Sequence, residues 1–299
     1  MTHQTAKTSF LSISQDKTIA YRRFGAPNGT PLLILTHFRG VMDKFDPLLI
    51  NLLSRSRPVI LIDYTGVGLS TGPVATSIAQ SADDILLFLS LLDISSADVL
   101  GFSLGGMVAQ LITLNADPAK LQVRKLIVTG STPSFGPGVQ TTPNEDVGVY
   151  AGVKDVTVDA FKTLFFWKDE EGNEAAEAWW ARVNERTEGT AGERVASWVS
   201  QGFEDGAVGL QAQIAQASGW GTEEGSRGRE GSWARLKGLG VPVLVANGAD
   251  DYMIPTVNSF VMQQELGNGQ LVVYPKSGHG FLFQYAELFA KHVELFLGA

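Results

Sequence analysis

The chain has 299 residues, no cysteine and a formal net charge of −8 at pH 7. Its length allows one large core with an insertion, and the lack of cysteine excludes disulfides, thiolate zinc sites and a cysteine nucleophile. The acidic balance argues against nucleic acid and membranes as partners, and a polar N-terminus without any membrane-length apolar segment predicts a cytoplasmic protein.

The first part of the chain alternates strand-like and helix-like patterns. Apolar, strand-like stretches cover 18–24, 31–36, 58–63, 98–102 and 125–129, and helical patterns cover 47–54, 78–92 and 104–115. Such alternation predicts a mainly parallel sheet with helices on both of its faces.

One serine lies between two glycines where the strand 98–102 meets the helix 104–115. The sequence Gly101-Phe102-Ser103-Leu104-Gly105 has the pattern G-x-S-x-G, and Gly106 extends the run of small residues. In this pattern the strand and the helix nearly touch, and the sharp turn lifts the serine hydroxyl clear of the sheet. We therefore predict that Ser103 is a nucleophile.

The segment 134–236 differs in character from the part before it. Its helices are rich in glutamate and alanine, and its part up to residue 231 holds five of the six tryptophans of the chain, namely Trp167, Trp179, Trp180, Trp198 and Trp220. Strand periodicity resumes after it, at 242–246. This organisation predicts a helical, aromatic insertion between two strands of the sheet.

The last part of the chain supplies a histidine and two candidate acids. His279 is flanked by glycines on a loop after the strand 270–274, whereas His292 lies in an amphipathic helix at 285–297, where a solvated position is expected. Asp250 and Asp251 both follow the strand 242–246, and the residue types alone do not separate them. A serine hydroxyl needs a base that is held in one tautomer by a carboxylate, and His279 with one of these aspartates would provide it.

These residues in this order resemble the α/β-hydrolase fold superfamily. The acid loop of that family often reads G-x-x-D-x-x-x-P, which Gly248, Asp251 and Pro255 match, so the resemblance implies Asp251 as the acid of a triad with Ser103 and His279. It also implies an α/β fold with a helical cap inserted after the sixth strand. The core would then comprise 1–133 and 237–299, and the cap 134–236.

A serine hydrolase of this kind needs an oxyanion hole of two backbone N–H groups. The N–H of Leu104, directly after the nucleophile, is expected to be one donor. The second is expected from His37-Phe38-Arg39-Gly40, where many family members carry glycine in place of Phe38, and it remains open between Phe38 and Arg39. By resemblance, His37 organises this loop and is not the base.

Two roles are open for the Arg39 side chain. It could form an ion pair with Asp43 or Asp46, or it could point into the pocket and bind a carboxylate of the substrate.

The predicted reaction is hydrolysis of an ester or lactone of a hydrophobic small molecule, without a cofactor or a metal. The alternatives are C–C bond hydrolysis by the same triad, or a small-molecule receptor that does not turn over. Substrate contacts are expected from Phe102, Trp167, Trp179 and Trp180. Adjacent helical side chains point about 100° apart, so Trp179 and Trp180 are expected to face different surroundings, one of them the cleft or a partner subunit in a homodimer.

Overall fold

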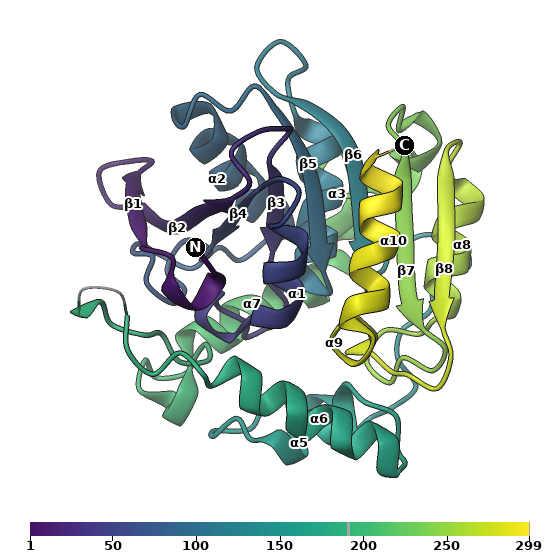
Figure 1. Ribbon diagram of the computed structural model, residues 1–299. Coiled ribbons are helices and arrows are strands. Elements are labelled where there is room, and N and C mark those ends of the chain that lie inside the picture. The colour runs from purple at the N-terminus through teal and green to yellow at the C-terminus, as the bar shows by residue number, and fades with distance from the viewer. Residues whose placement is uncertain (190–191, 299) are drawn as a thin grey trace.

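The computed structural model describes residues 1–189 and 192–298. Its strands form one sheet in the order β1-β2-β4-β3-β5-β6-β7-β8 (Figure 1). The pairs β1–β2 and β2–β4 are antiparallel, and all other neighbours are parallel. The strands are β1 (Ser9–Ser12), β2 (Thr18–Gly25), β3 (Leu32–Leu35), β4 (Pro58–Ile62), β5 (Ser96–Phe102), β6 (Gln122–Thr129), β7 (Val243–Gly248) and β8 (Gly269–Tyr274).

Helices cover both faces of this sheet. One face carries α2 (Ile78–Leu91), α3 (Leu104–Asn115) and α8 (Val257–Glu265), and the other carries α1 (Pro47–Leu53) and α10 (Ala286–Gly298). The strands and helices predicted in the core lie within a few residues of the observed ones, whereas β1, α8 and the short helix at 281–284 were not predicted. Among the described helices, none combines the length and the apolar character that crossing a bilayer requires.

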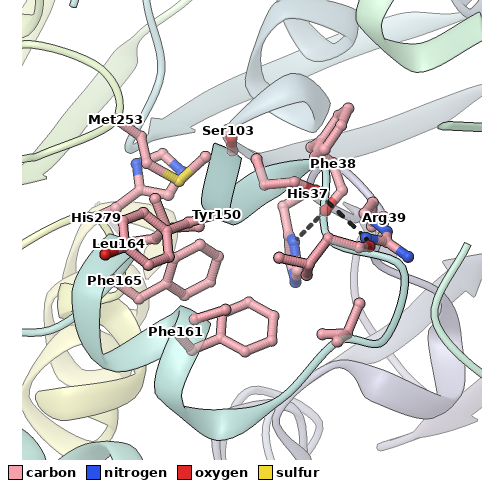
Figure 2. Close-up of a pocket in the computed structure, with 14 residues that line it drawn as sticks. His37, Phe38, Arg39, Ser103, Tyr150, Phe161, Leu164, Phe165, Met253 and His279 are labelled. Atoms are coloured by element: carbon pink, nitrogen blue, oxygen red, sulfur yellow. Dashed lines mark hydrogen bonds between the residues drawn. The ribbon is translucent and has the colours of Figure 1, made fainter. Parts of the chain in front are cut away.

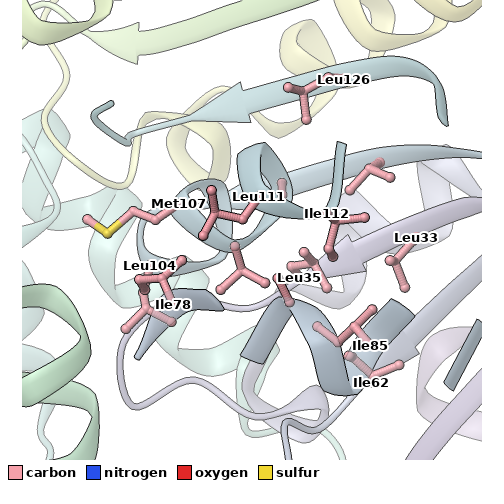
Figure 3. Close-up of a cluster of buried hydrophobic side chains, with 14 of the residues drawn as sticks. Leu33, Leu35, Ile62, Ile78, Ile85, Leu104, Met107, Leu111, Ile112 and Leu126 are labelled. Atoms are coloured by element: carbon pink, nitrogen blue, oxygen red, sulfur yellow. The ribbon is translucent and has the colours of Figure 1, made fainter. Parts of the chain in front are cut away.

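The continuous apolar run of β3 follows from burial on both faces of the sheet. Leu33 and Leu35 pack with α2 and α3 in one cluster (Figure 3), while Leu32 and Ile34 belong to the cluster under α1 and α10. Successive side chains of a strand point to opposite faces, so a strand covered on both sides has to be apolar at every position.

The segment 134–236, called the cap below, contains α4 (Val147–Ala151), α5 (Val158–Leu164), α6 (Glu170–Val183) and α7 (Val208–Trp220). Figure 1 shows α5 and α6 across the edge at which β7 and β8 end, beside the short helix α9 (Phe281–Gln284). The carboxyl ends of the parallel strands meet at this edge, where ligands bind in open α/β sheets. The division of the chain into two domains at 134 and 236 stays a prediction.

The N-terminal segment is fixed to the cap by a buried network of charges. Arg186 donates to the carbonyl oxygens of Gln4 (2.9 Å) and Ala6 (3.1 Å), and beneath it Arg22 and Asp43 form a buried ion pair of 2.6 Å. Burial, with a contribution from the nearby Arg22 charge, lowers the pKa of His3 to about 3.

We expect His3 to make the protein less stable in acid. Its folded-state pKa lies below the usual 6.5, so between these values the unfolded chain binds the proton and the folded one does not. The free energy of unfolding should therefore fall as the pH drops below 6.5, by roughly 2 kcal/mol from this residue by pH 5. Urea unfolding at several pH values should show a flatter dependence for His3→Gln, and an unchanged slope would contradict this.

Candidate active site

The turn between β5 and α3 holds Ser103 in a conformation that few residues other than glycine adopt. Its backbone angles are φ 57° and ψ −120°, and the residue is buried. A side chain at Gly101 would collide with the carbonyl of Gly105, and one at Gly105 would lie 2.5 Å from the carbonyl oxygen of Leu35. The glycines are therefore required by the close approach of β5, α3 and β3, as the pattern predicts.

Asp251 and His279 are joined by a hydrogen bond of 2.7 Å between Oδ2 and Nδ1, and both are buried. The second carboxylate oxygen of Asp251 accepts the backbone N–H groups of Met253 and Ile254, each at 2.9 Å. The carboxylate thus has a fixed orientation, and it fixes the tautomer of His279 with the hydrogen on Nδ1. The Nε2 atom of His279 is buried and has no partner within the described residues.

The structure brings Asp251 to His279 and leaves Asp250 exposed. The backbone N–H of Asp250 donates to the carbonyl of Ser277 (3.1 Å), which ties the acid loop to the histidine loop. Asp250 therefore helps to shape the two loops through its main chain.

Ser103 and His279 line the same pocket beneath the cap (Figure 2), which holds about 400 Å³ of empty space, part of it open to solvent. Its walls are mostly apolar. The lining residues are His37, Phe38, Arg39, Ser103, Tyr150, Ala151, Val153, Val156, Ala160, Phe161, Leu164, Phe165, Met253 and His279. Walls of this character suit an apolar molecule.

The loop after β3 is a tight turn from His37 to Gly40. The N–H of Gly40 donates to the carbonyl of His37 (2.9 Å), and Arg39 at the third position has φ 60°, whereas Phe38 has no positive φ. This is the pattern of a type II turn, whose third position favours glycine. A left-handed conformation costs a residue with a side chain roughly 1 to 2 kcal/mol, so contacts elsewhere have to hold Arg39 in place.

The two candidate donors in this turn differ in how they are bonded. The backbone N–H of Arg39 donates to Oε1 of Gln213 on α7 at 2.7 Å. Within the described residues, neither the N–H of Phe38 nor that of Leu104 has a partner. In the described residues the N–H groups of Phe38 and Leu104 are therefore free, whereas that of Arg39 is occupied.

His37 is buried and neutral at physiological pH. Burial lowers its pKa to about 3, and its Nδ1–H donates to the carbonyl of Phe38 at 2.8 Å. It therefore contacts the turn in the way that the resemblance implies. A histidine that resists protonation so strongly is a poor general base.

The structure contradicts one of the two expected roles of the Arg39 side chain, the ion pair. Asp43 pairs with Arg22 and Asp46 pairs with Arg182 (2.7 Å), so neither forms an ion pair with Arg39. The guanidinium donates instead to backbone carbonyls of the cap. The ion-pair prediction is wrong. Arg39 does line the pocket, and its binding of a substrate carboxylate stays a prediction.

The aromatic residues predicted to contact substrate are not among those that line the pocket. Phe102 is buried with its ring 4.9 Å from that of His279, and Trp179 is buried. Trp167 and Trp180 are half-buried, and none of the four lines the pocket. Their contact with substrate stays a prediction, while Phe102, Trp179 and Trp180 pack against other aromatic side chains.

Trp179 and Trp180 share one aromatic cluster. The ring centroids of both lie within 6.2 Å of that of Trp198, and both also pack against Phe161. The two rings are thus not fully separated, because a ring as large as tryptophan can reach across the angle of about 100° between adjacent helical positions. Trp179 is nevertheless buried and Trp180 half-buried, and a face turned to the cleft or to a partner subunit stays a prediction.

The cap side chains that do line the pocket were not predicted. They come from α4, the connection to α5, α5 itself and the residue after it, with Tyr150, Phe161 and Phe165 as the largest (Figure 2). Phe165 also accepts the N–H of Gly280 with its carbonyl (2.7 Å), and its ring lies 5.1 Å from that of His279. The Phe165-Phe166 pair in the sequence was the available signal, but nothing local separates a pocket wall from a core.

Two further predictions concern groups outside this pocket. His292 is half-buried, and its Nδ1 is bonded to the hydroxyl of Tyr274 at 2.6 Å, so its role in α10 is in packing and not in solvation. In the described part of the chain, no three His, Asp or Glu side chains are grouped as metal ligands.

The sheet order, the elbow and the loop positions define the class of this protein. The chain belongs to the α/β-hydrolase fold family: residues 30–285 match the sequence model described as alpha/beta hydrolase fold. The predicted fold class is thereby confirmed.

Individual proteins show the same likeness. The chain is similar to the solved alpha/beta hydrolase fold protein from Chitinophaga pinensis, with 32% identity, a TM-score of 0.84 and coverage of 100% of both chains. It is also similar to "Putative carbamate hydrolase RutD" of Caulobacter sp. (strain K31), 25% identical over 84% of each chain. A "Non-heme chloroperoxidase" of Streptomyces lividans is 22% identical over 93% of this chain and 95% of its own.

Proposed function

We propose that the protein is a cofactor-independent serine hydrolase that cleaves an ester or lactone of a hydrophobic small molecule. The observation that carries this is the buried 2.7 Å bond between Asp251 and His279 at a pocket that Ser103 also lines. The Nε2 atom of His279 has no partner among the described residues, as a base awaiting a hydroxyl proton would be. The relative whose name reads "Putative carbamate hydrolase RutD" agrees with acyl transfer.

In the proposed reaction Ser103 Oγ attacks the substrate carbonyl carbon while His279 Nε2 takes the hydroxyl proton. The imidazolium is stabilised by Asp251, which keeps its negative charge. The carbonyl oxygen becomes an oxyanion, for which we propose the N–H groups of Phe38 and Leu104 as donors. His279 then protonates the leaving alcohol, and water, activated by the same histidine, releases the acid from the acyl-enzyme.

The walls of the pocket support a neutral, apolar substrate. Its cap side is built from Phe161, Phe165, Leu164 and the valines 153 and 156, and the Arg39 guanidinium is held by carbonyl groups of the protein. Burying a substrate charge in such surroundings without a partner is costly. We therefore expect neutral esters with aromatic or branched acyl groups to be preferred over acetates and over anionic esters.

A substrate series tests this preference. The kcat/KM of p-nitrophenyl esters should rise with the size of an apolar acyl group up to the pocket limit. Phe161→Ala should lower kcat/KM for aromatic acyl esters by about tenfold, because ring contacts are lost, and change acetate hydrolysis little. Phe260→Ala, which removes an exposed ring from α8, is the matched control. A preference for acetate that Phe161→Ala leaves unchanged would contradict the proposed substrate class.

Turnover separates the proposed hydrolase from a receptor and from a C–C hydrolase. An esterase should release many equivalents of p-nitrophenol per site from aryl esters, and lactones should give the corresponding hydroxy acids. Binding of aryl esters with less than one equivalent of product would favour a receptor. Faster cleavage of a diketone than of any ester or lactone would favour C–C bond hydrolysis.

A further inference from the structure

Arg39 connects the turn after β3 to two separate stretches of the cap. Its Nε donates to the carbonyl of Val199 (2.8 Å) and its Nη2 to that of Ser200 (3.2 Å). Its Nη1 donates to the carbonyls of Val153 (2.5 Å) and Ala151 (3.3 Å) at the end of α4. The side chain is buried, and no carboxylate of the described residues lies within ion-pair distance of it. The cap carbonyls are its hydrogen-bond partners.

The cap in turn holds the backbone of Arg39. Gln213 on α7 accepts its N–H at 2.7 Å, and the N–H of Val199 donates to its carbonyl at 3.0 Å. Arg39 has the left-handed conformation that its turn position requires and that glycine adopts more easily. The contacts that compensate for this conformation come from the cap.

We propose that Arg39 is a positioning residue for the turn His37–Gly40. Through Arg39, the conformation of this turn, and with it the position of the proposed oxyanion donor of Phe38, depends on the cap being closed over the pocket. Its side chain fastens the cap stretches 151–153 and 199–200 over the pocket. The same cap, through Val199 and Gln213, keeps Arg39 left-handed. When the cap lifts, both sets of bonds are lost together and the turn relaxes, so the donors are correctly placed only over an enclosed substrate. This inference rests on the proposed function.

Three substitutions distinguish the effect of the Arg39 side-chain hydrogen bonds from the effect of its backbone conformation. Arg39→Gly removes the side-chain hydrogen bonds to the cap, but glycine adopts the left-handed conformation without strain. Arg39→Ala removes the same bonds and also strains the backbone. Arg39→Lys keeps the charge but has a single donor group. We expect kcat on a neutral aryl ester to fall by about tenfold or more in Arg39→Gly and further in Arg39→Ala, with KM changed by less than about threefold. Arg39→Lys should be intermediate.

Hydrogen exchange measures how firmly the Arg39 hydrogen bonds hold the cap, without relying on activity. In the intact protein, amides of 147–156 and 195–213 should exchange at least about tenfold faster in Arg39→Gly than in the unsubstituted protein. Arg182→Ala is the matched control, because Arg182 also ties the cap to the core, through Asp46 and the carbonyl of Phe283 (3.3 Å), but does not contact residues 37–40. It should loosen α6 and leave kcat within about threefold.

Several results would overturn the proposal. Unchanged hydrogen exchange of both cap stretches in Arg39→Gly would show that Arg39 does not hold the cap in place. An equal loss of kcat in Arg182→Ala would show a general effect of cap loosening, and a rise in KM confined to anionic esters would show that Arg39 binds substrate. If the unsubstituted protein hydrolyses nothing and Ser103 is unreactive, the proposed function fails, while the exchange result still decides whether Arg39 holds the cap.

Discussion

Ser103→Ala should abolish ester hydrolysis while the protein stays folded. The alanine keeps the Cβ that the turn already accommodates, so the strained backbone and its neighbours need not change. Without the hydroxyl no acyl-enzyme forms, and because triad residues act as a unit we expect kcat to fall by about 10⁴-fold or more. Steady-state rates on an aryl ester, with thermal unfolding as a check on folding, measure this.

Ser81→Ala is the control for Ser103→Ala. Ser81 is a buried serine whose hydroxyl donates to Gln216 (3.0 Å), and it does not line the pocket. Its removal should affect stability and not kcat. Near-normal turnover by Ser103→Ala would refute the acyl-enzyme scheme, whatever the control shows.

Asp251→Asn should have the second large effect. An asparagine amide at this position can donate to Nδ1 of His279, which would place the imidazole hydrogen on Nε2 and leave no base for Ser103. We expect kcat to fall by roughly 10⁴-fold, with KM little changed. The rate of phosphonate labelling of Ser103 should fall in parallel, because it depends on the same base.

Asp250→Asn is the neighbouring comparison on the same loop. Its carboxylate is exposed, and the contact it makes to the histidine loop comes from its backbone N–H. We expect kcat to change by less than about tenfold. Equal or inverted effects of the two substitutions would mean that Asp251 is not the residue that orients His279.

The sequence predicts those parts of the fold and site that local patterns determine. The glycines around Ser103 are needed wherever a strand and a helix meet so closely, and alternating apolar segments are needed for a sheet buried on both faces. Those constraints act within a few residues, so they are visible in one chain. The choice of Asp251 over Asp250 depended on family resemblance, because adjacent carboxylates have the same chemistry.

Contacts between distant segments are not predicted by local sequence patterns. Arg39 meets Val153 and Val199, which lie more than a hundred positions away along the chain, and these contacts decide its role. Likewise Trp179 and Phe161 are both apolar and helical in pattern, yet only Phe161 lines the pocket. Which apolar side chain faces a cavity is determined by how whole helices pack, and no periodicity encodes it.

Labelling with a serine-directed fluorophosphonate tests the central claim, that Ser103 is a nucleophile activated by His279 and Asp251, most directly. The protein should be treated with the reagent, digested and mapped by mass spectrometry, with Ser103→Ala treated alongside. We predict one phosphonate adduct per chain, on the peptide that contains Ser103, and none in the alanine variant. A folded, unsubstituted protein that gains no adduct, or that gains one on another residue and keeps it in Ser103→Ala, would contradict the account.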